Sequence, residues 1–217
     1  IAKIYNDKGA DELCFLDIDA SYENRSATLS TVEAVASKVF IPLTVGGGVS
    51  KLKDIERLLE SGADKVSINT SAILDPSLVS SAAKKFGSQC IVVAVDSKRD
   101  GEKSYVYTHG GKNKTAFETS AWIKIVENEG AGEILLTSMD RDGTKIGFDN
   151  ELTSSITKDL TIPLITSGGA GTIDHMVEGI TDGKADAVLA ASIFHQKEIT
   201  ITEVKKGLAS KGIEVRL

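Results

Sequence analysis

The sequence predicts an α/β fold, and within that class a (β/α)8 barrel of the TIM type, made of two half-barrel repeats. Two observations predict it. Short apolar segments alternate with helical patterns, which is typical of parallel strands joined by helical crossovers. In addition, three of these segments recur in the same order about half a chain later. An open, doubly wound sheet is the alternative, because periodicity alone does not show that a sheet closes.

The predicted strands are nearly continuous in apolar residues, as expected for strands that are covered on both faces. They lie at residues 12–18, 40–46, 65–69, 90–96, 133–139, 162–168 and 186–192. Helical patterns are clearest at residues 30–38, 52–61, 76–86, 119–129 and 173–181. Asp75 and Pro76 favour a helix start, because a capping side chain precedes a proline. No Pro/Ser-rich linker divides the chain, so we expect a single domain over residues 1–217.

The internal repeat has a nearly constant spacing. Residues 41–48 recur at 162–169, an offset of 121 residues, and residues 63–70 recur at 185–192, one residue later. The strand predicted at 90–96 has no counterpart, because its repeat position would precede the first printed residue. We therefore expect the printed sequence to lack the first strand of the barrel and the loop that follows it.

Composition limits the function classes. The chain has 217 residues, of which 41% are hydrophobic and 26% charged, and its formal net charge is −6. The acidic balance argues against a general nucleic-acid binder but leaves room for a local anion pocket. Cys14 and Cys90 lie inside apolar runs, and we interpret them as buried, reduced thiols of a cytoplasmic protein. No apolar stretch approaches the ~18 residues of a membrane span.

Two glycine-rich segments follow predicted strands at corresponding places in the two halves. Residues 45–48 read VGGG and residues 167–171 read SGGAG, and each is followed one strand later by a small polar segment, at 67–70 and 190–192. Glycine lets backbone N–H groups approach an anion, and the next helix start adds its dipole. The duplicated pair predicts two phosphate cradles and a long substrate with a phosphate at each end. The alternative is that the glycines only relieve crowding at strand–helix turns.

Carboxylates at the ends of predicted strands are the candidates for acid/base chemistry. Asp96 is the strongest candidate, because it directly follows five apolar residues. Asp17 and Asp19 end the first predicted strand, and Asp140 and Asp142 follow the fifth. The alternative interpretation is that aspartate is common in loops and at helix N-caps, which would explain at least one of Asp140 and Asp142. The histidines lack ligand spacing and no cofactor fingerprint is present, so we expect neither a metal nor a cofactor.

Longer motifs carry a resemblance to a known family. The segments DELCFLDIDAS, GADKVSINT, FGSQCIVVAVDSKR, VYTHGG and GAGEILLTSMDRDGTK are similar, in this order, to the cyclase subunit of imidazole glycerol phosphate synthase. The resemblance covers essentially the whole chain and implies a (β/α)8 barrel of histidine biosynthesis. Such a cyclase takes ammonia from a glutaminase subunit. It converts a bisphosphorylated ribulosyl-formimino aminoimidazole carboxamide ribonucleotide into imidazole glycerol phosphate and an aminoimidazole carboxamide ribotide.

The resemblance also implies roles for single residues. Asp96 corresponds to one of the two acid/base aspartates of the family, and the other belongs to the strand that we expect the printed sequence to lack. The implied phosphate ligands are Gly48, Asn69 and Thr70 in one half and Gly143, Gly168, Gly169, Ala191 and Ser192 in the other, with Thr137 and Asp142 lining the substrate. The implied ammonia gate consists of Glu12, Lys65 and Glu133, and the glutaminase partner is expected to dock near Asp11 and Asp64.

Other functions remain open at this point. The sister barrel of the same pathway, an isomerase, acts on the preceding intermediate, which carries the same two phosphates. A cyclase-like subunit that donates ammonia in sugar amidination is a third possibility. The non-enzyme alternative is a truncated chain that only binds phosphate or docks a glutaminase. We also expect almost no cyclase activity from the printed chain alone, because one carboxylate cannot both remove and deliver protons at different atoms.

Overall fold

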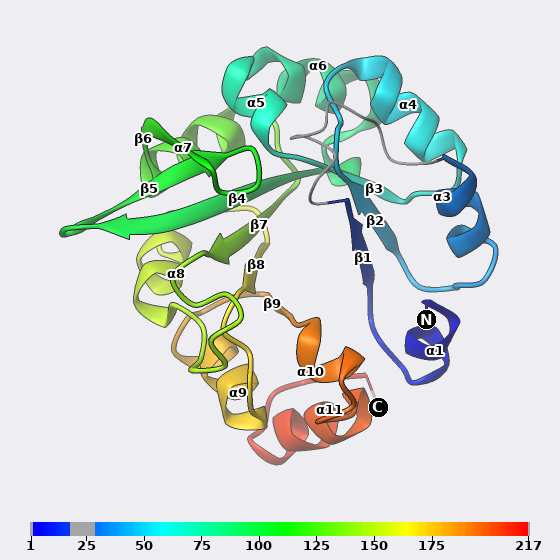
Figure 1. The fold of residues 1–217 in the computed structure, drawn as a ribbon, viewed down its shortest axis with the longest axis vertical. Coiled ribbons are helices and arrows are strands. Elements are labelled where there is room, and N and C mark those ends of the chain that lie inside the picture. The colour runs from blue at the N-terminus through cyan, green and yellow to red at the C-terminus, as the bar shows by residue number, and fades with distance from the viewer. Residues whose placement is uncertain (1, 18–28, 217) are drawn as a thin grey trace.

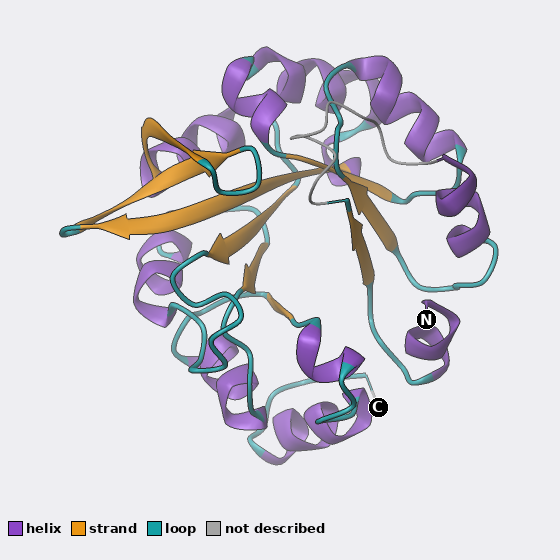
Figure 2. Cartoon of the chain, viewed as in Figure 1, coloured by secondary structure: helices purple, strands orange, loops and turns teal. Residues whose placement is uncertain are grey.

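The computed structural model describes residues 2–17 and 29–216, so Asp19 lies outside the described residues. It shows a curved sheet with helices α3 to α9 around its outer side (Figure 1). Helices on one side of a curled sheet are typical of a barrel, whereas a doubly wound sheet carries helices on both faces. Figure 2 shows the strands at the centre of this arrangement. The predicted α/β fold of the (β/α)8-barrel class is therefore confirmed.

The barrel sheet has the order β1-β2-β3-β4-β7-β8-β9 among the described residues, and all neighbours on this path are parallel. Each of these strands falls in a predicted segment except β4, which continues past the predicted end at Asp96 as far as Asp100, because its last residues pair with an antiparallel strand that was not predicted. Their bounds are β1 (Leu13–Leu16), β2 (Leu43–Gly46), β3 (Lys65–Ile68), β4 (Ile91–Asp100), β7 (Glu133–Ser138), β8 (Leu164–Ser167) and β9 (Ala187–Leu189). Within the described residues β1 pairs only with β2 and β9 only with β8, so the sheet is open between β1 and β9.

The opening is bridged by contacts between the two ends of the chain, which lie close together in Figure 1. Tyr5 Oη and His195 Nδ1 are 2.6 Å apart, and their rings lie 5.6 Å from each other. Lys205, which is buried, donates a hydrogen bond of 2.7 Å to Asp11. These contacts join the first helix (Ala2–Asp7) and the segment after it to the last two helices of the described chain (Ser192–His195 and Ile201–Ser210).

The helices surround the sheet, and the five clearest predictions are confirmed. Their bounds are α1 (Ala2–Asp7), α3 (Leu29–Ala36), α4 (Leu52–Glu60), α5 (Thr70–Leu74), α6 (Ser77–Phe86), α7 (Thr119–Asn128), α8 (Asn150–Thr157), α9 (Ile173–Thr181), α10 (Ser192–His195) and α11 (Ile201–Ser210). Helix α6 begins at Ser77, one residue after the predicted first position at Pro76, and the Asp75 carboxylate accepts a hydrogen bond from the N–H of Ser77, as expected for the predicted capping side chain. None of the helices in the described residues is long and apolar enough to cross a membrane.

Asp140 and Asp142 lie in the turn after β7, one of the two places that the sequence analysis allowed for them, and neither caps a helix. Helix α8 is capped by Asp149, whose carboxylate accepts a hydrogen bond from the N–H of Leu152. The reason is that the chain turns directly after β7, where the N–H of Asp142 donates to the carbonyl of Ser138. The loop then runs on to Asp149, after which helix α8 begins.

A β-hairpin that the sequence analysis did not predict follows β4. It consists of β5 (Lys103–Thr108) and β6 (Asn113–Glu118), and β5 pairs antiparallel with the extended end of β4. The hairpin projects away from the barrel sheet in Figure 2. Its residues alternate between polar and β-prone types instead of forming an apolar run, as expected for strands with one exposed face.

The internal repeat is visible in the backbone. The N–H of Leu43 donates to the carboxylate of Asp64 (2.8 Å), and the N–H of Leu164 donates to the carboxylate of Asp186 (2.9 Å). In both cases the aspartate's own N–H bonds back to the carbonyl of the same leucine. Each half therefore uses one aspartate to join the starts of two neighbouring strands.

The apolar core lies mainly between the sheet and its helices. Val66, Ile91 and Ile134 of the sheet are fully buried, as is Trp122 of α7, whose ring packs 5.0 Å from that of Phe117. Because parallel strands place all their carboxyl ends at one edge, this core fixes the loops that follow the strands.

Candidate functional site

Asp96 lies toward the carboxyl end of the barrel sheet and is partly buried. Its carboxylate accepts a hydrogen bond of 2.9 Å from Asn69 Nδ2. Burial raises the pKa of Asp96 above its ordinary value, the hydrogen bond from Asn69 opposes this, and the negative charge of Asp142 adds to it. A carboxyl group whose pKa moves toward neutrality is suited to exchanging protons with a substrate.

The first predicted cradle comes together after β2 and β3. Gly48 has a φ of +65°, a conformation that glycine adopts freely. The hydroxyl of Ser71 donates to the carbonyl of Val49 (2.6 Å), which holds the glycine loop beside the start of α5. Asn69 is the N-cap residue of α5, and Thr70 is its first residue and is buried. Gly48, Asn69 and Thr70 thus lie on two adjacent loops.

The second predicted cradle follows β8 and β9. Gly168 and Gly169 have φ values of +91° and +103°, and a Cβ at Gly169 would collide with the carbonyl oxygen of Gly147. Strand β8 pairs with β9 through Ser167 and Leu189, so this glycine loop lies beside the loop that carries Ala191 and Ser192. Both of these residues are exposed.

The remaining predicted residues lie between the two cradles. Strand pairing places Thr137 of β7 level with Asp96, and it places Ser167 of β8 level with Thr137. Asp142 is exposed in the turn after β7, and its N–H lies 3.3 Å from the position that a Cβ on Gly168 would take. Gly143 has a φ of +73° and open space beside it. The structure therefore brings the predicted substrate residues to one rim of the sheet.

A charged cluster lies at the opposite edge, where the strands begin. Lys65 donates hydrogen bonds of 2.9 Å to Glu12 and 2.7 Å to Glu133. The exposed fractions of the three side chains are 20% for Lys65, 44% for Glu12 and 12% for Glu133. Burial lowers the pKa of Lys65, but the hydrogen bonds and charges of Glu133 and Glu12 outweigh it, so this pKa lies above its ordinary value.

Cys14 lies close to the same cluster. Burial raises the pKa of its thiol to about 12, and the negative charges of Glu133 and Glu12 add to the shift, whereas Lys65 opposes it. Both cysteines are free, as predicted, although each keeps part of its surface exposed. With such a pKa, Cys14 is a neutral thiol that lies beside the ion pairs at the strand starts.

The two residues predicted at a partner interface also have partners within the chain. Asp11 pairs with Lys205 (2.7 Å) and with Arg216 (3.3 Å), while Asp64 accepts the hydrogen bond from Leu43 described above. Both aspartates remain exposed at the strand-start edge. Nearby, the ring of Phe40 is 91% exposed, a feature that the sequence analysis missed because Phe40 lies in an apolar run.

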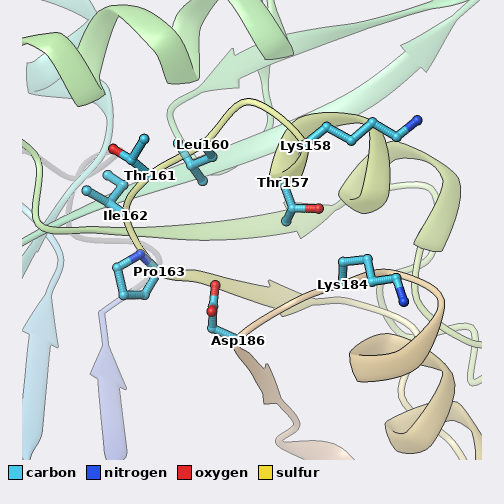
Figure 3. Close-up of a pocket in the computed structure, with 8 residues that line it drawn as sticks. All are labelled: Thr157, Lys158, Leu160, Thr161, Ile162, Pro163, Lys184 and Asp186. Atoms are coloured by element: carbon cyan, nitrogen blue, oxygen red, sulfur yellow. The ribbon is translucent and has the colours of Figure 1, made fainter.

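The cavities do not coincide with the predicted substrate residues. One of about 320 Å³ lies at the starts of β8 and β9 (Figure 3). It is lined by Thr157, Lys158, Leu160, Thr161, Ile162, Pro163, Lys184 and Asp186, and in Figure 3 the carboxylate of Asp186 points into the space beside Pro163. A second, of about 590 Å³, lies between α7 and α8. No group of three or more His, Cys, Asp or Glu within residues 2–17 and 29–216 could hold a metal ion.

The chain was also compared with models of protein families. The model of the family described as histidine biosynthesis protein matches residues 1–200. This span is most of the chain, and the chain therefore belongs to this family.

Proposed function

We propose that this histidine biosynthesis protein is the cyclase subunit of imidazole glycerol phosphate synthase. In this proposal it uses ammonia from a glutaminase partner to close an imidazole ring in a bisphosphorylated substrate. The products are imidazole glycerol phosphate and an aminoimidazole carboxamide ribotide. The observation that carries the choice is the cluster of Lys65, Glu12 and Glu133 at the strand starts.

This cluster separates the cyclase from the isomerase of the same pathway. Both enzymes would need two phosphate cradles and an acid/base carboxylate at the carboxyl rim. An isomerase, however, takes its only substrate at that rim and has no use for charges at the opposite edge. A partly buried lysine between two carboxylates costs desolvation energy, so stability alone does not account for this cluster. Admission of ammonia through the strand-start edge would account for it.

The two cradles would hold the substrate at its ends. Backbone N–H groups of the loops at Gly48 and Gly169, together with the starts of the following helices, offer donors to the phosphate oxygens. Asp96 and Thr137 lie between the cradles, where the middle of a long bisphosphate would pass. The glycines permit this approach because a side chain at Gly169 would collide with the backbone of the adjacent loop.

Asp96 would act as a general acid/base in ring closure. The reaction removes protons from the incoming nitrogen and delivers protons where bonds break. Burial raises the pKa of Asp96, which favours its protonated form and helps it to return a proton. Asn69 donates to one carboxylate oxygen (Asp96 Oδ2) and so fixes the orientation of the group. A positioned acid/base is typically worth about 10²–10⁴ in rate.

The glutaminase partner would dock at the strand-start edge. Phe40 is an exposed aromatic ring there, and aromatic side chains are enriched among residues that carry binding energy in protein interfaces. Asp64 lies exposed at the same edge and directly precedes Lys65 of the charged cluster. A partner that covers Phe40 and Asp64 would release ammonia beside Lys65.

The proposed function is tested by assaying the protein, expressed from its own gene, with both substrates of the two sister barrels. We expect ammonia-dependent formation of imidazole glycerol phosphate and no isomerisation of the preceding intermediate. Adding the glutaminase of the same source should make glutamine an effective nitrogen donor. Isomerase activity without ring closure would refute the cyclase assignment. An Asp96→Asn variant, which keeps the shape of the side chain, is the control for a contaminating enzyme.

A further inference from the structure

The hairpin after β4 returns to the level of the candidate acid. The chain reverses direction after Asp100, the last residue of β4. In the antiparallel pairing that follows, Lys103 of β5 lies opposite Asp100, and Tyr107 lies opposite Asp96. The turn at residues 108–112, which joins β5 to β6, therefore lies beside the carboxyl ends of the barrel strands, although the turn at residues 101–102, which joins β4 to β5, projects outward.

This turn is wedged between the loops on either side of β4. The backbone N–H of His109 donates a hydrogen bond of 3.0 Å to the hydroxyl oxygen of Thr70, which follows β3. On the other side, a Cβ at Gly111 would come within 2.5 Å of the methyl group of Met139, which follows β7. The turn thus contacts both neighbours of the strand that carries Asp96.

The conformation of the turn is unusual. His109, Gly110 and Gly111 have φ values of +54°, +63° and +81°, so three successive residues are left-handed. Glycine accepts this freely, but a histidine with positive φ is uncommon and is held there by its surroundings. The His109 ring contributes, because Nδ1 lies 3.0 Å from the hydroxyl of Thr108 and 3.3 Å from the amide of Asn113.

The contact with Thr70 determines what its hydroxyl can do. A threonine hydroxyl has one hydrogen to donate and two lone pairs. One lone pair of Thr70 accepts the His109 N–H, and among the described residues the hydroxyl hydrogen has no acceptor. Thr70 is buried and lies in the first cradle, directly after Asn69, which orients Asp96. Its hydroxyl is thereby presented as a hydrogen-bond donor at the cradle.

We propose that the turn at residues 108–112 is part of the first phosphate cradle and that His109 is a positioning residue, whose backbone N–H fixes the Thr70 hydroxyl as a donor to the phosphate. The chemical class of the ligand, one end of a bisphosphorylated sugar derivative, rests on the proposed function. The geometry of the turn and of Thr70 is independent of the proposed function. The hairpin, which lies outside the repeated strand–helix units, thus contributes to substrate binding in one half only.

The test is a double-mutant cycle read by inorganic phosphate. Phosphate is titrated into the protein while NMR follows the amides of Thr70 and Gly169, which report the two cradles separately. Thr70→Val removes the donor, and Gly111→Val distorts the turn, because a β-branched residue does not readily adopt the φ of +81° that Gly111 has there. Each should weaken phosphate binding at the first cradle about tenfold, as expected for a hydrogen bond to a charged group. The double variant should lose no more phosphate affinity than the single variant that binds phosphate more weakly, because both changes remove the same interaction.

Three controls keep the outcome unambiguous. Thr70→Ser retains the hydroxyl and should bind phosphate within about twofold of the original protein. Lys103→Gln, at the far end of the hairpin, should change neither cradle, and Gly169 should report unchanged affinity in every variant. If Gly111→Val does not fold, hydrogen exchange of the His109 amide replaces it: phosphate should slow this exchange in the original protein but not in Thr70→Val.

Additive losses in the cycle, or unchanged exchange at His109 on phosphate binding, would overturn the inference. These results are separate from a failure of the proposed function. Ring closure by the original protein together with additive losses would support the cyclase function and refute the positioning role of His109. Phosphate binding with non-additive losses, but without turnover of the cyclase substrate, would support the positioning role and refute the cyclase function.

Discussion

Replacing Lys65 by methionine should destabilise the protein by an amount set mainly by Glu133. The substitution keeps the length of the side chain and removes the charge that both carboxylates contact. Glu133 is only 12% exposed, so it would be left as an unpaired carboxylate with little access to water. Glu12 is 44% exposed and can be solvated instead.

The magnitude follows from these exposures. Breaking a fully buried ion pair costs about 3–5 kcal/mol, whereas an exposed pair contributes about 0.2–1 kcal/mol. Lys65 and Glu133 lie between these limits, which gives about 2 kcal/mol for Lys65→Met and less than about 1 kcal/mol for Glu12→Gln. In a chain of this size 1 kcal/mol corresponds to roughly 2–4 °C, so Lys65→Met should lower Tm by about 4–8 °C.

The assay is urea and thermal unfolding of Lys65→Met, Glu12→Gln and the double variant Lys65→Met/Glu133→Leu. Removing Glu133 as well should recover about 1 kcal/mol, because the orphaned charge is gone. The pKa of Lys65 is raised, so the contribution of the pair is fully present below the ordinary pKa of 10.5. It is lost only as the pH rises through the higher value of the folded protein. Equal stability of Lys65→Met and the original protein at pH 7 would refute this reasoning.

Two further predictions concern the rim and the strand starts. Asp96→Asn should raise Tm at pH 7, because burial raises the pKa of Asp96 and its ionised form destabilises the fold. This gain should vanish as the pH falls toward the ordinary carboxyl pKa, and turnover should fall by at least about 10²-fold. A Tm that does not rise would contradict the burial argument. Asp64→Lys should impair glutamine-dependent turnover but not ammonia-dependent turnover, whereas Asp186→Lys, which breaks the equivalent hydrogen bond to Leu164, should impair neither selectively. Equal effects of the two charge reversals, measured at saturating partner, would count against docking at Asp64.

The sequence predicted the strands well because burial on both faces leaves a direct signature. Asp96 could be found in the same way, since it interrupts an apolar run near the carboxyl end of a strand. The hairpin could not, because residues 103–118 alternate in polarity and carry several charges. His109 was missed for a different reason: its contact with Thr70 is made by a backbone N–H, which every residue except proline possesses.

Long-range pairing was also outside the reach of local patterns. Asp11 contacts Lys205, which lies 194 residues away in the sequence. A pattern of charges along the chain does not reveal such a pair, because it depends on how the two ends of the chain meet. Helix α8 was not predicted for a similar reason, since only the fold shows that the loop after β7 runs on to Asp149 before a helix begins.

The differences between the two halves bear on the proposed partner. Both halves keep the aspartate that joins two strand starts, which the fold requires of each. At the next position, however, Lys65 in the first half corresponds to Ala187 in the second, and the exposed Phe40 corresponds to Thr161. Stability alone would place similar residues at equivalent positions, and an exposed phenylalanine adds nothing to the core. One partner bound over the first half would explain why these residues differ at the strand starts while the glycine loops at the opposite rim remain paired.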